Sequence, residues 1–99
     1  MEPIQISKKT ERAAEWEYAV LLGHESDDIG FLVKIDQQHW EELTGARTTP
    51  EHLIKKSFRF LLKKQSKYSI PQTFDLRDIQ RRFPEYKKHI MKPKFFWFA

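Results

Sequence analysis

The stretch TTPEHLIKKSFRFLLKKQSK, residues 48–67, decides the fold because it predicts one long amphipathic helix. Thr49 is a good N-cap, and Pro50 and Glu51 suit the first turn of a helix. Apolar residues recur at helical spacing on one side of this helix: Ile54, Phe58, Leu61 and Leu62. Cations gather on another side: Lys55, Lys56, Arg59, Lys63 and Lys67. Such a helix needs an apolar surface to cover.

That surface is predicted upstream, in EWEYAVLLGHESDDIGFLVKID, residues 15–36. Apolar and polar residues alternate on both sides of a turn-forming segment at residues 23–30, which is typical of a half-buried β-hairpin. The alternating apolar residues are Trp16, Tyr18, Val20 and Leu22, then Phe31, Val33 and Ile35. Ile4 and Ile6 in PIQIS, residues 3–7, indicate a third strand. A lone hairpin is marginally stable in water, so we expect helices to cover this sheet.

Short helices are predicted on either side of the long one. Asp36 can cap a helix that runs to Leu43, with Gly45 as the left-handed residue that ends it. TFDLRDIQRRFPEYKKHIMKP, residues 73–93, predicts two more helices that meet at Pro84, the second ending near Met91 before Pro93. Its start has a capping box of Asp75 and Asp78 and a hydrophobic staple of Phe74 and Ile79. The expected fold is therefore α+β: an N-terminal antiparallel hairpin, or three strands, packed against three or four short helices.

Length and composition predict one domain over residues 1–99. Residues 1–45 hold the hairpin and a short helix and are acidic; residues 46–99 are helical and basic and end in an aromatic tail. The formal charge is −5 over residues 1–50, from five Lys/Arg and ten Asp/Glu, and +9 over residues 51–99, from thirteen and four. The two halves either attract each other within one fold or present a basic face to an anionic partner.

Several classes of protein are excluded by composition. Without cysteine the chain has no disulfide, no zinc–thiolate site and no thiol catalysis. No stretch approaches the roughly 20 apolar residues of a membrane span, and the N-terminus lacks a secretory apolar run. We therefore expect a cytoplasmic protein without a membrane partner.

Residues 50–86 carry a resemblance to a known group. PEHLIKKSFRFLLKK (residues 50–64) and IPQTFDLRDIQRRFPEY (residues 70–86) resemble the C-terminal signature of a group of small uncharacterised prokaryotic proteins. In that group an SFxFLL helix precedes an FDLxxIxxxFPEY segment. The resemblance implies a fold and no activity or site. Members look more acidic after the FLL helix than LLKKQSKYS (residues 61–69), so it does not imply a shared basic surface.

No catalytic or metal-binding motif is present. The four histidines stand apart, without an HExxH or similar ligand spacing. His24 with Asp27 and Asp28 is interpreted as a solvated turn rather than a metal site. Three glycines cannot supply a phosphate-binding loop, and Ser26 does not stand in a GxSxG elbow. We therefore expect a non-enzymatic protein with no cofactor and no metal.

Two features are left for binding a partner. Lys55, Arg59 and Lys63 are stacked one helical turn apart, either as a track for a polyanion or as a solvated face, and Arg81 adds to the positive charge. The tail KPKFFWFA, residues 92–99, has three interpretations. Its rings complete the protein's own core, anchor it in a partner's groove, or stack on unpaired bases.

The function predicted from the sequence is that of a small binding or adaptor protein that docks a macromolecular partner protein through its basic C-terminal half and aromatic tail. The alternative is a nucleic-acid-binding protein, of RNA or DNA, that uses the cations and stacking rings. Self-association of the acidic half with the basic half stays open. The candidate partner-binding residues are Lys55, Arg59, Lys63, Arg81, Lys94, Phe95, Phe96, Trp97 and Phe98.

Overall fold

The computed structural model describes residues 3–91, apart from the side chain of Lys9. Its elements follow the chain as β1 (Ile4–Arg12), β2 (Glu15–Leu22), β3 (Ile29–Asp36), α1 (Gln37–Thr44), α2 (Pro50–Lys64), a 3₁₀ turn η1 (Lys67–Ser69), β4 (Thr73–Asp75), α3 (Leu76–Arg82) and α4 (Glu85–Ile90). The predicted α+β fold is confirmed, including the third strand at the N-terminus. The short strand β4 was not predicted.

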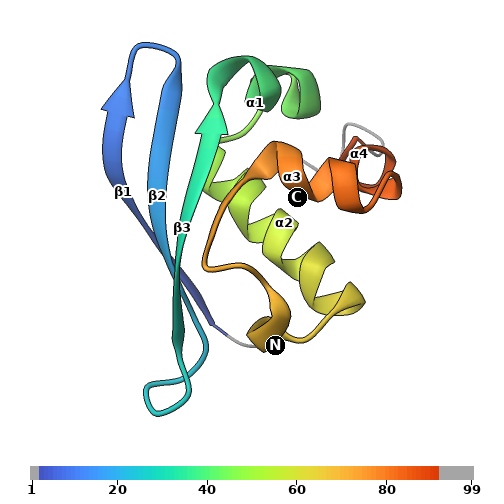
Figure 1. Ribbon diagram of the computed structural model, residues 1–99. Coiled ribbons are helices and arrows are strands. Elements are labelled where there is room, and N and C mark those ends of the chain that lie inside the picture. The colour runs from blue at the N-terminus through green and yellow to red at the C-terminus, as the bar shows by residue number, and fades with distance from the viewer. Residues whose placement is uncertain (1–2, 92–99) are drawn as a thin grey trace.

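The strands form one sheet in the order β1-β2-β3-β4. β1, β2 and β3 pair antiparallel, as a meander, whereas β4 returns after α1 and α2 to pair parallel with β3. The α-helices lie on one side of this sheet, and no helix of the described residues covers the other side (Figure 1). The alternation in β2 and β3 explains this arrangement, because it places the buried apolar side chains of both strands on one face.

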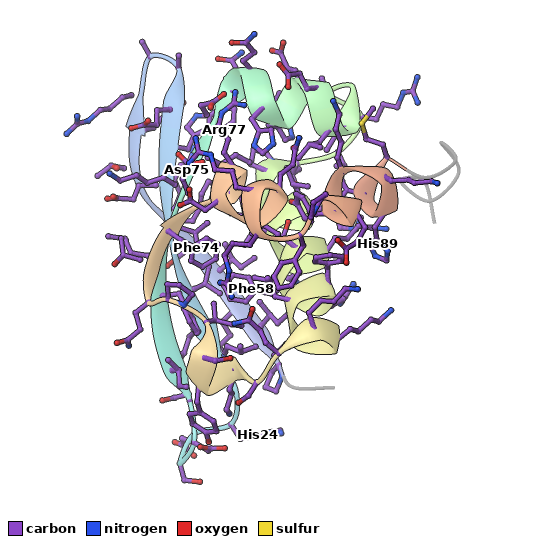
Figure 2. All side chains as sticks on the ribbon, turned by 45° about the vertical axis from the view of Figure 1, so that its right-hand side comes forward. His24, Phe58, Phe74, Asp75, Arg77 and His89 are labelled. Carbon is purple, nitrogen blue, oxygen red and sulfur yellow. The ribbon has the colours of Figure 1, made fainter. Side chains whose placement is uncertain are left out.

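Phe58 of α2 stands at the centre of the core. It is completely buried, and its ring contacts the rings of Phe31 on β3 and Phe74 on β4, with centroids 5.2 and 5.9 Å apart. Figure 2 shows Phe58 and Phe74 in the space between the sheet and α2. The ring of Phe74 reaches this position because β4 pairs with β3.

The buried side of α2 is wider than predicted. Ile54, Phe58 and Leu61 are buried as expected, but Leu62 is only half-buried. Leu53, Ser57 and Phe60 are buried as well, because α4 packs along a second side of the helix. There the Ser57 and Tyr86 hydroxyls form a buried hydrogen bond of 2.6 Å, and the Phe60 and Tyr86 rings lie 5.3 Å apart.

The predicted helix caps are confirmed. Asp36 accepts a hydrogen bond from the His39 backbone N–H, Thr49 accepts one from His52, and Asp75 and Asp78 form a capping box. Gly45 ends α1 with a φ of 64°, in the left-handed region that favours glycine.

Asp36 also joins two distant parts of the chain. Arg77 on α3 donates from Nε to Asp36 Oδ2 at 2.7 Å and from a terminal nitrogen to Oδ1 at 3.2 Å. One carboxylate thus ends β3, caps α1 and holds α3. The bound guanidinium and the backbone N–H of His39 lower the pKa of Asp36 against the opposing effect of burial.

His39 is the buried ionisable group beside this pair. Its side chain is 1% exposed, and neither ring nitrogen has a hydrogen-bond partner among the described residues. Burial and the positive charge of Arg77 lower its pKa, while Asp36, the Gln80 side chain and Asp75 act in the opposite direction with smaller effect. Burial therefore favours the neutral form of His39 in the folded protein.

We expect Phe58→Ala to lower the free energy of unfolding by about 3–5 kcal/mol, because it removes the ring on which two strands pack. Lys63→Ala, on the exposed side of the same helix, should change it by less than about 0.5 kcal/mol. Urea unfolding followed by circular dichroism measures both values. Equal effects would contradict the placement of the two faces.

A second expectation concerns pH. Since the folded-state pKa of His39 is lowered, the unfolded chain takes up a proton first as the pH falls through about 6.5. Stability should therefore decline on acidification from about pH 7 to pH 5, and His39→Leu should make this decline shallower. Urea unfolding at a series of pH values tests this. His52→Gln should have a smaller effect, because His52 is less buried, and an unchanged decline in His39→Leu would refute the assignment.

Candidate partner-binding surface

Three cations form a row on the solvent side of α2, hereafter the basic face: Lys55, Arg59 and Lys63. All three are exposed, and none makes an ion pair with a described residue. Two other cations of the C-terminal half are compensated, Lys64 by Glu85 at 2.9 Å and Arg81 by Asp78 at 2.7 Å, whereas the exposed Arg82, Lys87 and Lys88 also lack an ion pair with a described residue. The predicted row is therefore present, and its charge is not neutralised by residues 3–91.

Neighbouring groups respond to this concentration of charge. Burial, followed by the charges of Lys56, Arg59 and Lys55, lowers the pKa of His52 in the first turn of α2. Partial burial and the nearby guanidinium of Arg59 likewise lower the pKa of Lys56. Both shifts disfavour additional protons at this end of α2, as expected beside uncompensated positive charge.

The prediction that Lys67 belongs to the same cationic side is wrong. Helix α2 ends at Lys64, and Lys67 in η1 turns toward the hairpin, with a side chain only 6% exposed. Its ammonium donates to the Asp27 carbonyl at 2.6 Å and to the Asp27 carboxylate at 3.1 Å. The loop needs Gly23 here, because an added Cβ would lie 2.7 Å from the Asp27 carbonyl oxygen and 2.9 Å from Lys67 Nζ.

Tyr68 follows in the 3₁₀ turn and presents an exposed ring beside the basic face. The ring is 67% exposed, its hydroxyl donates to the carboxylate of Asp27, and Lys67 Nζ lies 5.4 Å from its centroid. These contacts fix the ring, and the hydrogen bond from Tyr68, with that from Lys67, lowers the pKa of Asp27. No sequence pattern signals this residue, since its position depends on a contact with Asp27, 41 residues away.

A hollow of about 660 Å³ connects the ring to the basic face. Arg59, Lys63 and the half-buried Leu62 supply its α2 side, and the remaining lining comes from Asp27 and the segment after the helix: Gln65, Ser66, Lys67 and Tyr68. A second, smaller hollow of about 320 Å³ lies at the start of α2, where Lys55 and Arg59 meet Thr49, Glu51 and His52. Both hollows share Arg59, so the basic face is continuous between them.

The other predicted binding residues are not brought to this face. Arg81 is exposed on α3, where it pairs with Asp78 and lines a separate apolar pocket of about 330 Å³ with Leu61 from the buried side of α2. Lys94, Phe95, Phe96, Trp97 and Phe98 lie outside the described residues. Of the nine candidates, the structure thus gathers Lys55, Arg59 and Lys63.

Within residues 3–91, no group of three or more His, Asp or Glu side chains is placed to hold a metal ion. Figure 2 shows His24 at the tip of the hairpin and His89 on α4, at separate parts of the molecule. His24, Asp27 and Asp28 lie in an exposed turn as predicted, and Asp27 also binds Lys67 and Tyr68. None of the described helices has the length and apolar character needed to cross a membrane.

Comparison with known proteins returns no matching family model, curated protein or solved structure. The resemblance of residues 50–86 to small prokaryotic proteins accordingly stays a prediction.

Proposed function

We propose that the chain is a non-enzymatic binding module that docks an acidic segment of a partner protein on the basic face of α2. The observation that carries the proposal is the row of three exposed cations that lack an acidic partner among residues 3–91.

The row has a cost within the free chain. Like charges four residues apart on a helix repel each other by about 0.2–0.5 kcal/mol, and this spacing occurs twice, between Lys55 and Arg59 and between Arg59 and Lys63. Elsewhere the chain places a carboxylate three residues from a cation, as in Lys8–Glu11 and Asp78–Arg81. A surface that omits this compensation is suited to a ligand that supplies the negative charge.

The size of the row favours a short acidic ligand. Lys55 and Lys63 lie a little over two helical turns apart, which separates them by about 12 Å along the helix axis. Carboxylates bound the row at both ends: Glu51 beside the first hollow and Asp27 beside the second. A segment with two or three acidic side chains fits between them, whereas a long polyanion would pass a carboxylate at either end.

Tyr68 supports a second candidate, the binding of a single-stranded nucleic acid. Proteins that bind unpaired strands combine cations for the phosphates with exposed rings on which bases stack. Arg59 and Lys63 share a hollow with the exposed ring of Tyr68, which satisfies both requirements over one or two nucleotides. The two candidates are distinguished by the ligand that binds: an acidic peptide or a single-stranded RNA.

Charge reversal tests the proposal. We expect the native protein to bind a fluorescent oligoglutamate peptide in low salt, and the triple variant Lys55→Glu, Arg59→Glu, Lys63→Glu to lose this binding. The matched control is Arg12→Glu, Arg47→Glu, Lys87→Glu, which makes the same change in net charge at exposed positions away from the basic face and should retain it. Fluorescence anisotropy measures the affinities. Equal losses in both variants would mean that only net charge matters, and the proposed site would be wrong.

A single-stranded RNA oligonucleotide distinguishes the second candidate. If nucleic acid is the ligand, the logarithm of the RNA affinity falls with the logarithm of salt concentration, with a slope of about −0.7 per phosphate contacted. Tyr68→Ala should then weaken RNA binding and leave peptide binding unchanged, because only bases stack on the ring. RNA bound more tightly than the peptide would replace the partner-protein proposal.

The aromatic tail is tested by deletion of residues 94–99. If the tail is a partner anchor, the deletion leaves the melting temperature nearly unchanged and weakens partner binding, because each anchor ring contributes about 2 kcal/mol or more. A melting temperature that falls by many degrees would instead assign the four rings to the protein's own core.

A further inference from the structure

The side of the sheet that faces away from the helices, hereafter the outer sheet face, is largely free of charge at its centre. Its four rows follow the strand register, and the row at one end, of Arg12, Glu15 and Asp36, is charged. Two rows have no charged side chain: Gln5, Leu21, Gly30 and Gln72, then Ser7, Ala19, Leu32 and Thr73. The third holds Thr10, Glu17, Lys34 and Asp75. A broad hollow of about 710 Å³ lies over the uncharged rows, in a chain of which 32% of residues are charged.

Gly30 is the residue on this face that the fold itself does not explain. It lies inside β3 rather than in a turn, its φ is not positive, and a Cβ added to it would meet nothing within 4 Å. Glycine in a strand interior weakens the strand and often marks the close approach of another molecule. The Gln72 side-chain amide donates to the Gly30 carbonyl at 3.2 Å, but no atom of residues 3–91 occupies the space that a Cβ at Gly30 would enter, so this space is open to another molecule.

The cross-strand pairs at the centre of the face match a large residue with a small one, or opposite charges. Leu21, which is 37% exposed, stands beside Gly30. Ala19 stands beside Leu32, and Glu17 stands beside Lys34. A face with this pattern is complementary to itself when one copy is turned over onto another.

We propose that the outer sheet face binds a second copy of this chain face to face, about a two-fold axis that runs parallel to the strands between β2 and β3. This axis lays β2 of each copy over β3 of the other at the same height. Leu21 of one copy then meets Gly30 of the other, Ala19 meets Leu32, and Glu17 meets Lys34. Every central contact is a knob against a hole or an ion pair, as an isologous interface requires.

Charge and the flanking strands agree with this arrangement. Neither Glu17 nor Lys34 makes an ion pair with a described residue, so both remain available to the second copy. The same axis lays β1 over β4, and the polar residues Ser7 and Thr10 then face Thr73 and Asp75. Packed sheets lie about 10 Å apart and cross at about 30°, so the contacts nearest the axis match best.

A second copy is favoured over addition of a strand to the edge of the sheet. One edge of the sheet is β4, which has only three residues; the long edge is β1, which has a bulge between Lys8 and Thr10 and a salt bridge between Lys8 and Glu11. Bulges and lysines at an edge are features that oppose strand addition. The outer sheet face has no such feature at its centre, and its use does not depend on the function proposed for the basic face.

Sedimentation velocity over a range of protein concentrations tests the proposal. We expect a reversible dimer that is populated at high concentration, because four short strands form a small interface, of about 1,200 Å² in total or less. Gly30→Trp should abolish this dimer while leaving the thermal unfolding of the monomer unchanged or raised, since the added side chain meets open space and favours strands. Gln38→Trp, at an exposed position of α1 on the helical side, should leave the dimer intact.

A charge swap supplies an independent test. Glu17→Lys alone should weaken the dimer about tenfold, because it places two like charges together on each side of the axis, at the same height. Combining it with Lys34→Glu should restore the dimer, since the opposite charges then meet again. A chain that is monomeric at every concentration would overturn the proposal. So would a dimer unaffected by Gly30→Trp, which would place self-association at the strand edge or the aromatic tail.

Discussion

The packing of Phe58 between Phe31 and Phe74 is the interaction on which the other features of the molecule depend. It holds α2 against one face of the sheet and places β4 beside β3, with which it pairs. Helices α3 and α4 lie on the same side of the sheet as α2 (Figure 1). Because every α-helix of the described residues uses that face, two surfaces remain. One is the solvent side of α2, and the other is the outer sheet face.

The charge asymmetry between the two halves is partly resolved inside the fold. Two ion pairs join an acid of the N-terminal half to a base of the C-terminal half: Asp27 with Lys67, and Asp36 with Arg77. They lie at opposite ends of β3, one at the hairpin turn and one where the strand leads into α1. Asp27 lines the hollow beside Arg59 and Lys63 but is paired with Lys67, and neither ion pair includes a cation of the basic face, which explains why attraction between the halves does not neutralise that surface.

The local features of the fold followed from the sequence because they depend on neighbouring residues. The caps at Asp36, Thr49 and Asp75 and the alternation in the hairpin each act within a few positions, and all are confirmed. Features that depend on contacts between distant positions could not be predicted from the sequence. Three residues from Thr73 to Asp75 are too few for a strand pattern, and β4 exists only because β3 lies beside it.

The same distinction explains the outcome at the candidate site. The spacing of Lys55, Arg59 and Lys63 fixes their common side on any helix, so their exposure was predictable. Lys67 lies beyond the end of α2, and its burial against Asp27 depends on a loop 40 residues away. That contact in turn positions Tyr68, and no periodicity in the sequence could assign a ring beside the basic face.

The two proposed surfaces constrain each other geometrically. In a face-to-face dimer the helical layers lie outermost, so the basic faces of the two copies are separated by both sheets and by their own helices. A single acidic segment that spans about 12 Å cannot reach both of them. The dimer would therefore gain no added affinity for one short segment and would instead connect two partner molecules. Only a ligand with two acidic segments on a linker long enough to pass around the sheets would bind with avidity.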